Sequence, residues 1–299
     1  MNSESQRIVV AGSAGRLGST LVDMLCRRHQ VTGLSRPRFD LADSGSIAKA
    51  LGGLEYDHLI VTGALTGVDY CETHEDEAFT VNGTAPGIIA DISASKGAKV
   101  TYISTDMVFD GLKGSPYVET DKPNPVSIYG ASKLEGERRV MAASPENLVL
   151  RVSWVFGPGR PAFPEWIISQ ARVKSDVTLP EDKTGNPTYT MDLVEWLEAL
   201  ALGGAEDPAR GIYHLCNSGP CNWRDWGQLC IDVARDAGVP LLTREIRGVP
   251  LESVAAFVAK RPPNSTLDTG KFTRATDIRP RPWQDAIREF VVQISRSPA

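Results

Sequence analysis

A tyrosine and a lysine four residues apart mark a segment that could carry out acid–base chemistry. Tyr129 and Lys133 lie in SIYGASKLEGE, which has helical character, so both side chains project from one face of the expected helix. A tyrosine hydroxyl of pKa about 10 keeps its proton at neutral pH, and a neighbouring ammonium lowers that pKa and stabilises the phenolate left after proton donation. The pair suits general-acid reduction of a carbonyl, although this spacing also arises by chance on amphipathic helices.

Two hydroxyl side chains precede this pair at the end of an expected strand. The segment KVTYISTDMVFDG ends its strand at Ser104 and Thr105. A hydroxyl there could hydrogen-bond the carbonyl oxygen of a substrate, or could simply bond within the strand end. We expect one of these two hydroxyls to act together with Tyr129 and Lys133, because the glycine-rich turn near the amino terminus, the strand end and the Tyr–Lys pair follow one another in the order such a site needs.

A glycine-rich turn near the amino terminus indicates a dinucleotide site. In VVAGSAGRLG, three glycines spaced GxxGxxG separate a β-branched strand from a helix. Glycine lets the backbone approach a pyrophosphate, and the helix amino terminus presents free N–H groups; a purely structural turn is the alternative. The residues expected to line this part of the site are Gly12, Ala14, Gly15, Arg16, Leu17 and Gly18.

The end of the second expected strand bears on the choice of cofactor. The strand QVTGL is followed by Ser35, Arg36 and Arg38, where dinucleotide folds that bind NAD usually have an acidic residue. A carboxylate would repel a 2′-phosphate, whereas a guanidinium and a hydroxyl can pair with it. This favours NADP(H), with NAD(H) as the alternative; two solvated arginines would also explain the pattern.

The elements that must position these residues alternate along the chain. Beyond the first strand and helix, we expect strands at 30–34, 58–63, 99–104, 147–153 and 211–217, with helices at 46–53, 76–97 and 127–143. Alternation of this kind predicts an α/β fold, a Rossmann-type doubly wound parallel sheet with a smaller discontinuous substrate-binding lobe.

Proline and aromatic residues cluster in two separate stretches of the second half. They follow Trp154 in FGPGRPAFPEW and recur from Trp223 onward. We therefore predict that residues 1–155, with 184–216 returning to them, form the NADP-binding domain. Residues 156–183 and 217–299 form the lobe over the carboxyl edge of the sheet, where open α/β sheets bind ligands.

Composition excludes several classes of protein. The 299 residues are 41% hydrophobic and 23% charged, as in globular proteins. The net charge of −5 does not favour binding of a polyanion such as nucleic acid. Apolar runs are too short for a membrane span, and the MNSESQR start lacks the pattern of a signal peptide, so we expect a cytoplasmic protein. Five cysteines without a close pair and four histidines without ligand spacing predict neither disulfides nor a metal site.

The motifs together resemble one known family. GSAGRLG, FDLAD, VNGTAPGIIA, YISTDMVFDG, SIYGASKLEGE, LRVSWVFG, KTGNPTYTMDLV and RPPNS follow, in order and spacing, the dTDP-4-dehydrorhamnose reductase family of extended short-chain dehydrogenases. The resemblance covers nearly the whole chain. It implies NADPH-dependent reduction of the 4-keto group of a nucleotide-linked 6-deoxyhexose, converting dTDP-4-dehydro-L-rhamnose to dTDP-L-rhamnose for cell-surface polysaccharide. The oligomeric state stays open, with a homodimer as one alternative.

The resemblance also implies roles for individual residues. Tyr129 matches the proton donor, Lys133 the residue that binds the nicotinamide ribose, and Thr105 the hydroxyl that polarises the carbonyl. The residues that it adds on the cofactor side are Asp40, Leu41, Ala64, Leu65, Thr66 and Asn82. The residues expected on the substrate side are Ser104, Thr105, Asp106, Met107, Trp154, Phe163, Arg261 and Asn264.

Three departures from the family pattern qualify this reading. Met107 replaces a tyrosine beside the sugar, and the loop after SWVFG keeps only Phe163 of its usual Asn–Phe pair, which puts substrate choice in doubt. Thr20 and Met191 occupy positions where some members carry metal-binding carboxylates, so no metal requirement is expected.

Two further functions remain open from the sequence. The first is a non-catalytic, NADP-binding regulatory subunit of the methionine adenosyltransferase beta type, which Met107 and the altered loop favour and the intact Tyr129 and Lys133 disfavour. The second is a nucleotide-sugar epimerase or dehydratase with tightly bound NAD, which Ser35 and Arg36 disfavour.

Overall fold

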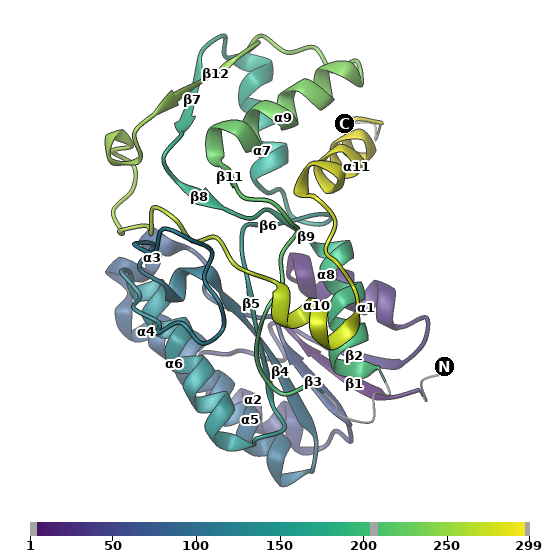
Figure 1. Cartoon of the computed structure of the whole chain (residues 1–299). Helices are drawn as coiled ribbons and strands as arrows, with labels where there is room; N and C mark the ends of the chain where they lie inside the picture. The colour runs from purple at the N-terminus through teal and green to yellow at the C-terminus, as the bar shows by residue number, and fades with distance from the viewer. Residues whose placement is uncertain (1–4, 204–208, 297–299) are drawn as a thin grey trace.

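A central parallel sheet forms the larger part of the computed structural model, which describes residues 5–203 and 209–296 (Figure 1). Its strands are β1 (Arg7–Ala11), β2 (Gln30–Leu34), β3 (His58–Val61), β4 (Lys99–Thr105), β5 (Leu148–Val152) and β10 (Gly211–His214). They lie in the order β10-β5-β4-β3-β1-β2, and every neighbouring pair is parallel. The predicted α/β class is confirmed. Residues 1–4 of the amino-terminal segment lie outside the described residues.

Helices cover both faces of this sheet. Their apolar sides complete two separate cores, because strands buried on both faces need a cover on each. One face carries α1 (Arg16–Leu25) and α8 (Thr190–Leu197) with the π-helical turn η3 (Glu198–Leu202), and the other carries α2 (Ser44–Gly52), α5 (Ala85–Ser95) and α6 (Ile128–Ala143).

The strand order fixes where a ligand can enter. The chain runs from β1 outward to β2 and then crosses to β3 on the opposite side of β1. The carboxyl ends of β1 and β3 therefore flank a topological switch point, the crevice where open α/β sheets bind their ligands. The residues that follow β1, β2, β3 and β4 all lie at this edge.

The helix expected over 76–97 is broken into three parts. The structure has α4 (Glu75–Phe79), a π-helical turn η1 (Thr80–Thr84) and α5, preceded by the short α3 (Val68–Thr73). Pro86 occupies the first turn of α5, where its missing N–H costs nothing, so a new helix starts there. The π turn places Asn82 against the loop that follows β3. This is a tertiary contact, which no local sequence pattern indicates.

The smaller lobe has a core of its own. It contains α7 (Phe163–Val173), α9 (Trp223–Asp236), α11 (Trp283–Arg296) and the parallel pair β7 (Val177–Pro180) and β12 (Ile246–Val249). Short ladders cross its base, joining β6 (Val155–Phe156) to β9 (Thr188–Tyr189) and β8 (Thr184–Gly185) to β11 (Cys221–Asn222).

One helix from the range assigned to the lobe packs elsewhere. The helix α10 (Gly270–Thr276) lies beside β10, and Phe272 is fully buried in the core under the sheet (Figure 1). The 3-10 turns η2 (Asp106–Val108) and η4 (Leu251–Ser253) complete the elements of the described residues. Within those residues, no helix combines the length and apolarity needed to cross a bilayer.

Candidate active site

The structure brings the three expected catalytic side chains to one edge of the sheet. Thr105 ends β4, and Tyr129 and Lys133 occupy the first two turns of α6. Gly130 allows the start of α6 to lie directly on η2, since a Cβ there would be 2.2 Å from the backbone oxygen of Met107. This close approach brings the Tyr129 hydroxyl into hydrogen-bond contact with Thr105.

Burial governs the protonation of this set. It raises the pKa of Tyr129 well above the usual value, with the hydrogen bond to Thr105 acting in the opposite direction. The Lys133 ammonium donates to the backbone oxygen of Ile103 at 2.7 Å and lies 4.0 Å from the Tyr102 ring centroid, and burial lowers its pKa to about 7. The expected lowering of the Tyr129 pKa by Lys133 is therefore not what the structure shows. The phenol is protonated at neutral pH, as a proton donor must be.

Ser104 differs from its expected place at the substrate. Its hydroxyl donates to Oε1 of Glu137 at 2.5 Å, and Arg151 donates to both carboxylate oxygens at 2.8 and 2.6 Å. All three residues are almost completely buried. A buried carboxylate needs several hydrogen-bond donors, and Ser104 supplies one of them. The Ser104 hydroxyl therefore helps to stabilise the contact between β4, β5 and α6.

Asp106 stands at the centre of a second buried network. Its carboxylate accepts hydrogen bonds from Ser153 at 2.9 Å, Ser265 at 2.5 Å and the adjacent Thr105 at 3.1 Å. The hydroxyl of Ser265 in turn accepts from the Lys183 ammonium at 3.0 Å. No local sequence pattern indicates Ser265 and Lys183 as members of this network, because they come from loops about 160 and 80 residues further along the chain.

The glycine-rich turn forms a cradle that fits a pyrophosphate. Gly12 has φ +97°, and a Cβ there would lie 2.4 Å from the backbone nitrogen of Gly63. A Cβ on Gly18 would lie 2.2 Å from the oxygen of Gly12, so the turn and α1 touch through backbone alone. The N-cap residue Gly15 makes no side-chain cap, which leaves the first N–H groups of α1 free for an anion.

Arg16 ties this turn to the base of the lobe. Its guanidinium donates to the backbone oxygen of Gly157 at 2.7 Å, and burial lowers the pKa of Arg16. This contact spans the two parts of the molecule at the expected cofactor site.

The other expected cofactor residues gather at the ends of β2 and β3. Ser35 is half-buried and Arg36 is exposed just beyond β2. Asn82 accepts from the backbone nitrogen of Leu65 at 2.8 Å and donates to its oxygen at 3.0 Å, which holds the loop after β3 against α6. The half-buried or exposed residues at the same edge are Asp40, Leu41, Ala64, Leu65 and Thr66.

On the substrate side, Trp154 has an unusual backbone. Its φ of +43° is rare for a large side chain and places strain beside the site. The ring stacks on Trp226 at 5.4 Å between centroids and contacts Trp223, and Lys183 lies 5.6 Å from its centroid.

An aromatic cavity of about 570 Å³ continues from Trp223 into the lobe. Its aromatic walls are Phe163, Trp166, Trp223 and Phe257, and Arg247 provides a cation. Arg247 is paired with Asp176 only through an exposed contact of 3.1 Å, which is a weak attachment. Of the substrate residues expected from sequence, Phe163 belongs to this cavity.

Arg261 and Asn264 have local partners in the structure. Arg261 is paired with Asp69 at 2.5 Å and stacks on Phe257 at 3.8 Å, so its guanidinium fixes its loop on α3. This hydrogen bond lowers the pKa of Asp69 to about 2. Asn264 accepts from Thr266 and donates to the backbone of its neighbouring loop at 3.3 Å. A substrate group that binds Arg261, as the sequence predicts, would therefore have to compete with the Asp69 carboxylate.

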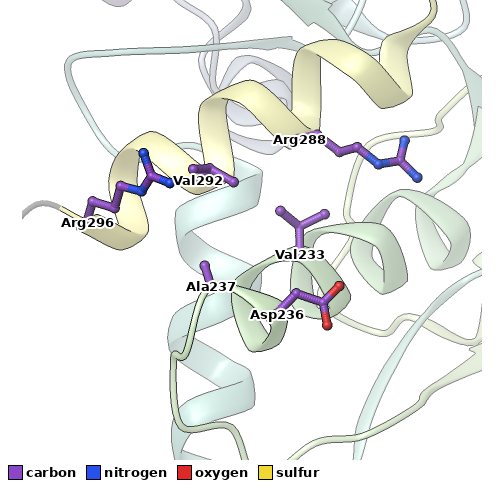
Figure 2. A pocket seen from close by; sticks show the side chains of 6 residues that line it. All are labelled: Val233, Asp236, Ala237, Arg288, Val292 and Arg296. Atoms are coloured by element: carbon purple, nitrogen blue, oxygen red, sulfur yellow. The ribbon is translucent and has the colours of Figure 1, made fainter.

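A second cavity of about 510 Å³ lies between α9 and α11 (Figure 2). It is lined by Val233, Asp236, Ala237, Arg288, Val292 and Arg296. The two arginines project from α11 and Asp236 projects from α9 (Figure 2). None of these residues belongs to the sheet edge, so the cavity is separate from the site described above.

Within the described part of the chain, no group of three His, Cys, Asp or Glu side chains is placed to hold a metal ion. Thr20 lies at a position where some family members carry a metal-binding carboxylate. Its hydroxyl is 3.4 Å from that of Thr190.

A glycine cradle at the switch point of a doubly wound sheet, with a threonine, tyrosine and lysine set at the next strand, defines a nicotinamide-dependent oxidoreductase of the extended short-chain type. Within that class, the chain belongs to the RmlD substrate binding domain family, whose model matches residues 6–296.

Individual relatives agree with this assignment. The chain is 33% identical to the spore coat polysaccharide biosynthesis protein SpsK of Bacillus subtilis, over 97% of this chain and 98% of that protein. It is 32% identical to a dTDP-4-dehydrorhamnose reductase of Sinorhizobium fredii, over 95% and 96%. The crystal structure of dTDP-4-dehydrorhamnose reductase from Bacillus anthracis in complex with NADP superposes with a TM-score of 0.89 at 25% identity, covering 97% and 99%.

Proposed function

We propose that this chain reduces the 4-keto group of dTDP-4-dehydro-L-rhamnose to dTDP-L-rhamnose with NADPH. The observation that carries the proposal is the contact of the Tyr129 hydroxyl with Thr105 at the end of β4, in a chain that the family model matches over residues 6–296. When bound, NADPH supplies the hydride. Tyr129 donates the proton to the carbonyl oxygen, and Thr105 orients that oxygen by a hydrogen bond.

The two parts of the molecule divide the binding between them. We assign the cofactor to residues 1–155 with 184–216, and the substrate to 156–183 and 217–299, apart from α10, which packs on the sheet. The cradle around Gly12 supports the first assignment, and Arg36 at the end of β2 supports NADPH over NADH.

The aromatic cavity supports a nucleotide-linked substrate. Its rings offer flat faces for a pyrimidine base, and Arg247 is a cation that can leave a weak surface pair for a phosphate. SpsK is named for polysaccharide biosynthesis, so we further propose that the product serves a cell-surface polysaccharide.

A substrate panel tests the proposal. The purified chain is mixed with dTDP- and UDP-linked 4-keto-6-deoxy sugars, each with NADPH or NADH, and the loss of reduced cofactor is followed. We expect the highest kcat/KM for dTDP-4-dehydro-L-rhamnose with NADPH. Tight binding of NADPH without turnover of any sugar would favour the regulatory alternative, and copurification of stoichiometric NAD would favour the epimerase.

A further inference from the structure

Lys183 is a buried ammonium that the mechanism above does not use. It lies in the loop between β7 and β8, with 3% of its surface exposed. Its Nζ donates to Ser265 and lies 5.6 Å from the Trp154 ring centroid. Removing an ammonium from water is unfavourable, so a buried lysine beside the site calls for a compensating role.

A continuous series of hydrogen bonds connects this ammonium to the proton donor. Lys183 donates to Ser265 at 3.0 Å, and Ser265 donates to Oδ2 of Asp106 at 2.5 Å. Oδ1 of the same carboxylate accepts from Thr105 at 3.1 Å, and Thr105 is bonded to Tyr129. Lys183, Ser265, Asp106 and Thr105 are buried, so water does not compete for the hydrogen bonds between them.

The direction of these bonds creates a conflict at Thr105. A threonine hydroxyl has one proton, and here that proton is given to Asp106. It cannot then be donated to the carbonyl oxygen of a substrate. The hydrogen bond from Thr105 to Asp106 breaks more readily when other donors balance the negative charge of the carboxylate. These donors are Ser153 at 2.9 Å and Ser265, which is itself bonded to Lys183.

We propose that Lys183 is a positioning residue whose positive charge, acting through Ser265 and Asp106, frees the Thr105 hydroxyl to bind the substrate carbonyl. This inference rests on the proposed reductase function. Lys183 itself does not contact the reacting atoms; it sets the orientation of the residue that does.

The charge on Lys183 changes within an accessible pH range. Burial lowers its pKa to about 8, with Asp106 raising it and Arg261 lowering it. The charged groups that face it are Asp106 from η2 and Arg261 from the loop after η4, the latter paired with Asp69 of α3. The ammonium is present below pH 8 and is lost as the pH rises through that value.

The test compares Lys183→Met with Lys271→Met. Lys271 is the control, because its ammonium also donates one hydrogen bond and lies near an aromatic ring, but at the far edge of the sheet: it bonds the backbone oxygen of Ile212 at 2.6 Å and lies 4.0 Å from the Tyr213 ring centroid. The measurements are kcat and KM between pH 6 and 10, and the Kd of NADPH by fluorescence.

For Lys183→Met we expect kcat at pH 7 to fall at least about tenfold, with the Kd of NADPH changed less than about twofold. The decrease in wild-type kcat around pH 8 should disappear, whereas any change near pH 7 from Lys133 should remain. Lys271→Met should retain the wild-type profile. An unchanged kcat, or a lower kcat that still decreases around pH 8, overturns the proposal.

Ser265→Ala provides a second variant if Lys183→Met does not fold. It cuts the same series of hydrogen bonds and keeps the lysine, so we expect a similar loss of kcat and of the decrease near pH 8. Wild-type kcat in this variant overturns the proposal. The wild-type chain is assayed first: its failure to reduce the sugar overturns the proposed function as well, whereas an active wild type with unaffected variants overturns the role of Lys183 alone.

Discussion

At the scale of the residue, the hydroxyl of Tyr129 lies in surroundings that keep it protonated. Burial disfavours its phenolate, and Thr105 is its hydrogen-bond partner. The proton is therefore available for donation throughout the neutral range, and transfer becomes favourable only when negative charge develops on a bound carbonyl oxygen.

Replacing this hydroxyl should separate catalysis from binding. Tyr129→Phe should lower kcat about 10²- to 10⁴-fold, since it removes the general acid and little else. NADPH binding, measured by fluorescence titration, should stay unchanged. Tyr56→Phe is the control, because Tyr56 also bonds a side-chain hydroxyl, that of Ser93 at 3.1 Å, but lies away from the site. Wild-type turnover by Tyr129→Phe would show that another group donates the proton.

Residue types and spacing correctly predicted which side chains lie together at the sheet edge. They were a poorer guide to the hydrogen-bond partner of each side chain. Thr105 and Tyr129 could be paired because strand-end and helix positions are local patterns. The partners of Ser104 and Arg261 are Glu137 and Asp69, which are 33 and 192 residues away in the chain. No local pattern indicates such partners, so the residue types alone predict a ligand as the partner of both the hydroxyl and the guanidinium group.

At the scale of the element, the placement of α6 depends on one buried ion pair. Glu137 lies two turns after Tyr129 and bonds Arg151 of β5 through both oxygens, with both side chains nearly inaccessible to water. Ser104 of β4 joins the same carboxylate. The catalytic helix is thereby attached to the two strands beneath it.

Breaking this pair should destabilise the protein strongly. Glu137→Gln leaves the Arg151 charge buried without a counter-charge, so the free energy of unfolding should fall by about 3–5 kcal/mol. Glu135→Gln is the control on the same helix. Glu135 pairs with Arg139 at the surface, where such pairs contribute about 0.3–0.5 kcal/mol. Urea denaturation measures both, and equal losses in the two variants would contradict the account.

The elements themselves followed from short-range patterns, with one exception. The apolar β-branched runs predicted the strands, and the glycine-rich turn predicted the start of α1. The helix expected at 76–97 is divided by a π turn because Asn82 must reach Leu65, a contact made in the folded chain alone.

At the scale of the whole molecule, buried histidines should make stability depend on pH. His58 of β3 bonds Thr101 at 2.7 Å, and burial lowers its pKa to about 4; His214 of β10 is buried as well, and its pKa is about 3. An unfolded histidine titrates at about 6.5. The unfolded chain therefore binds protons that the folded chain cannot, and stability is lost as the pH falls below that value.

The expected slope is about 1.4 kcal/mol per pH unit for each of these histidines between about pH 6 and pH 5. Urea denaturation at several pH values measures it. His58→Asn should remove one such contribution, and His74→Asn, at an exposed position, should leave the slope as it is. A free energy of unfolding that is constant from pH 7 to 5 would contradict the role of burial.

The arrangement of the two parts also explains how a chain of net charge −5 can bind anions. The free N–H groups of α1 offer one local site, and Arg247 in the aromatic cavity offers another. Each acts over a short range, which total charge does not reflect. A compact nucleotide fits such sites, whereas an extended polyanion does not.

The most direct test of the reductase assignment follows the hydride itself. The chain is incubated with dTDP-4-dehydro-L-rhamnose and NADPH deuterated at the transferable position, and the sugar product is examined by mass spectrometry and NMR. The account predicts one deuterium at C4 of dTDP-L-rhamnose for each NADPH consumed. Bound NADPH with no product, or a product without deuterium at C4, would contradict it.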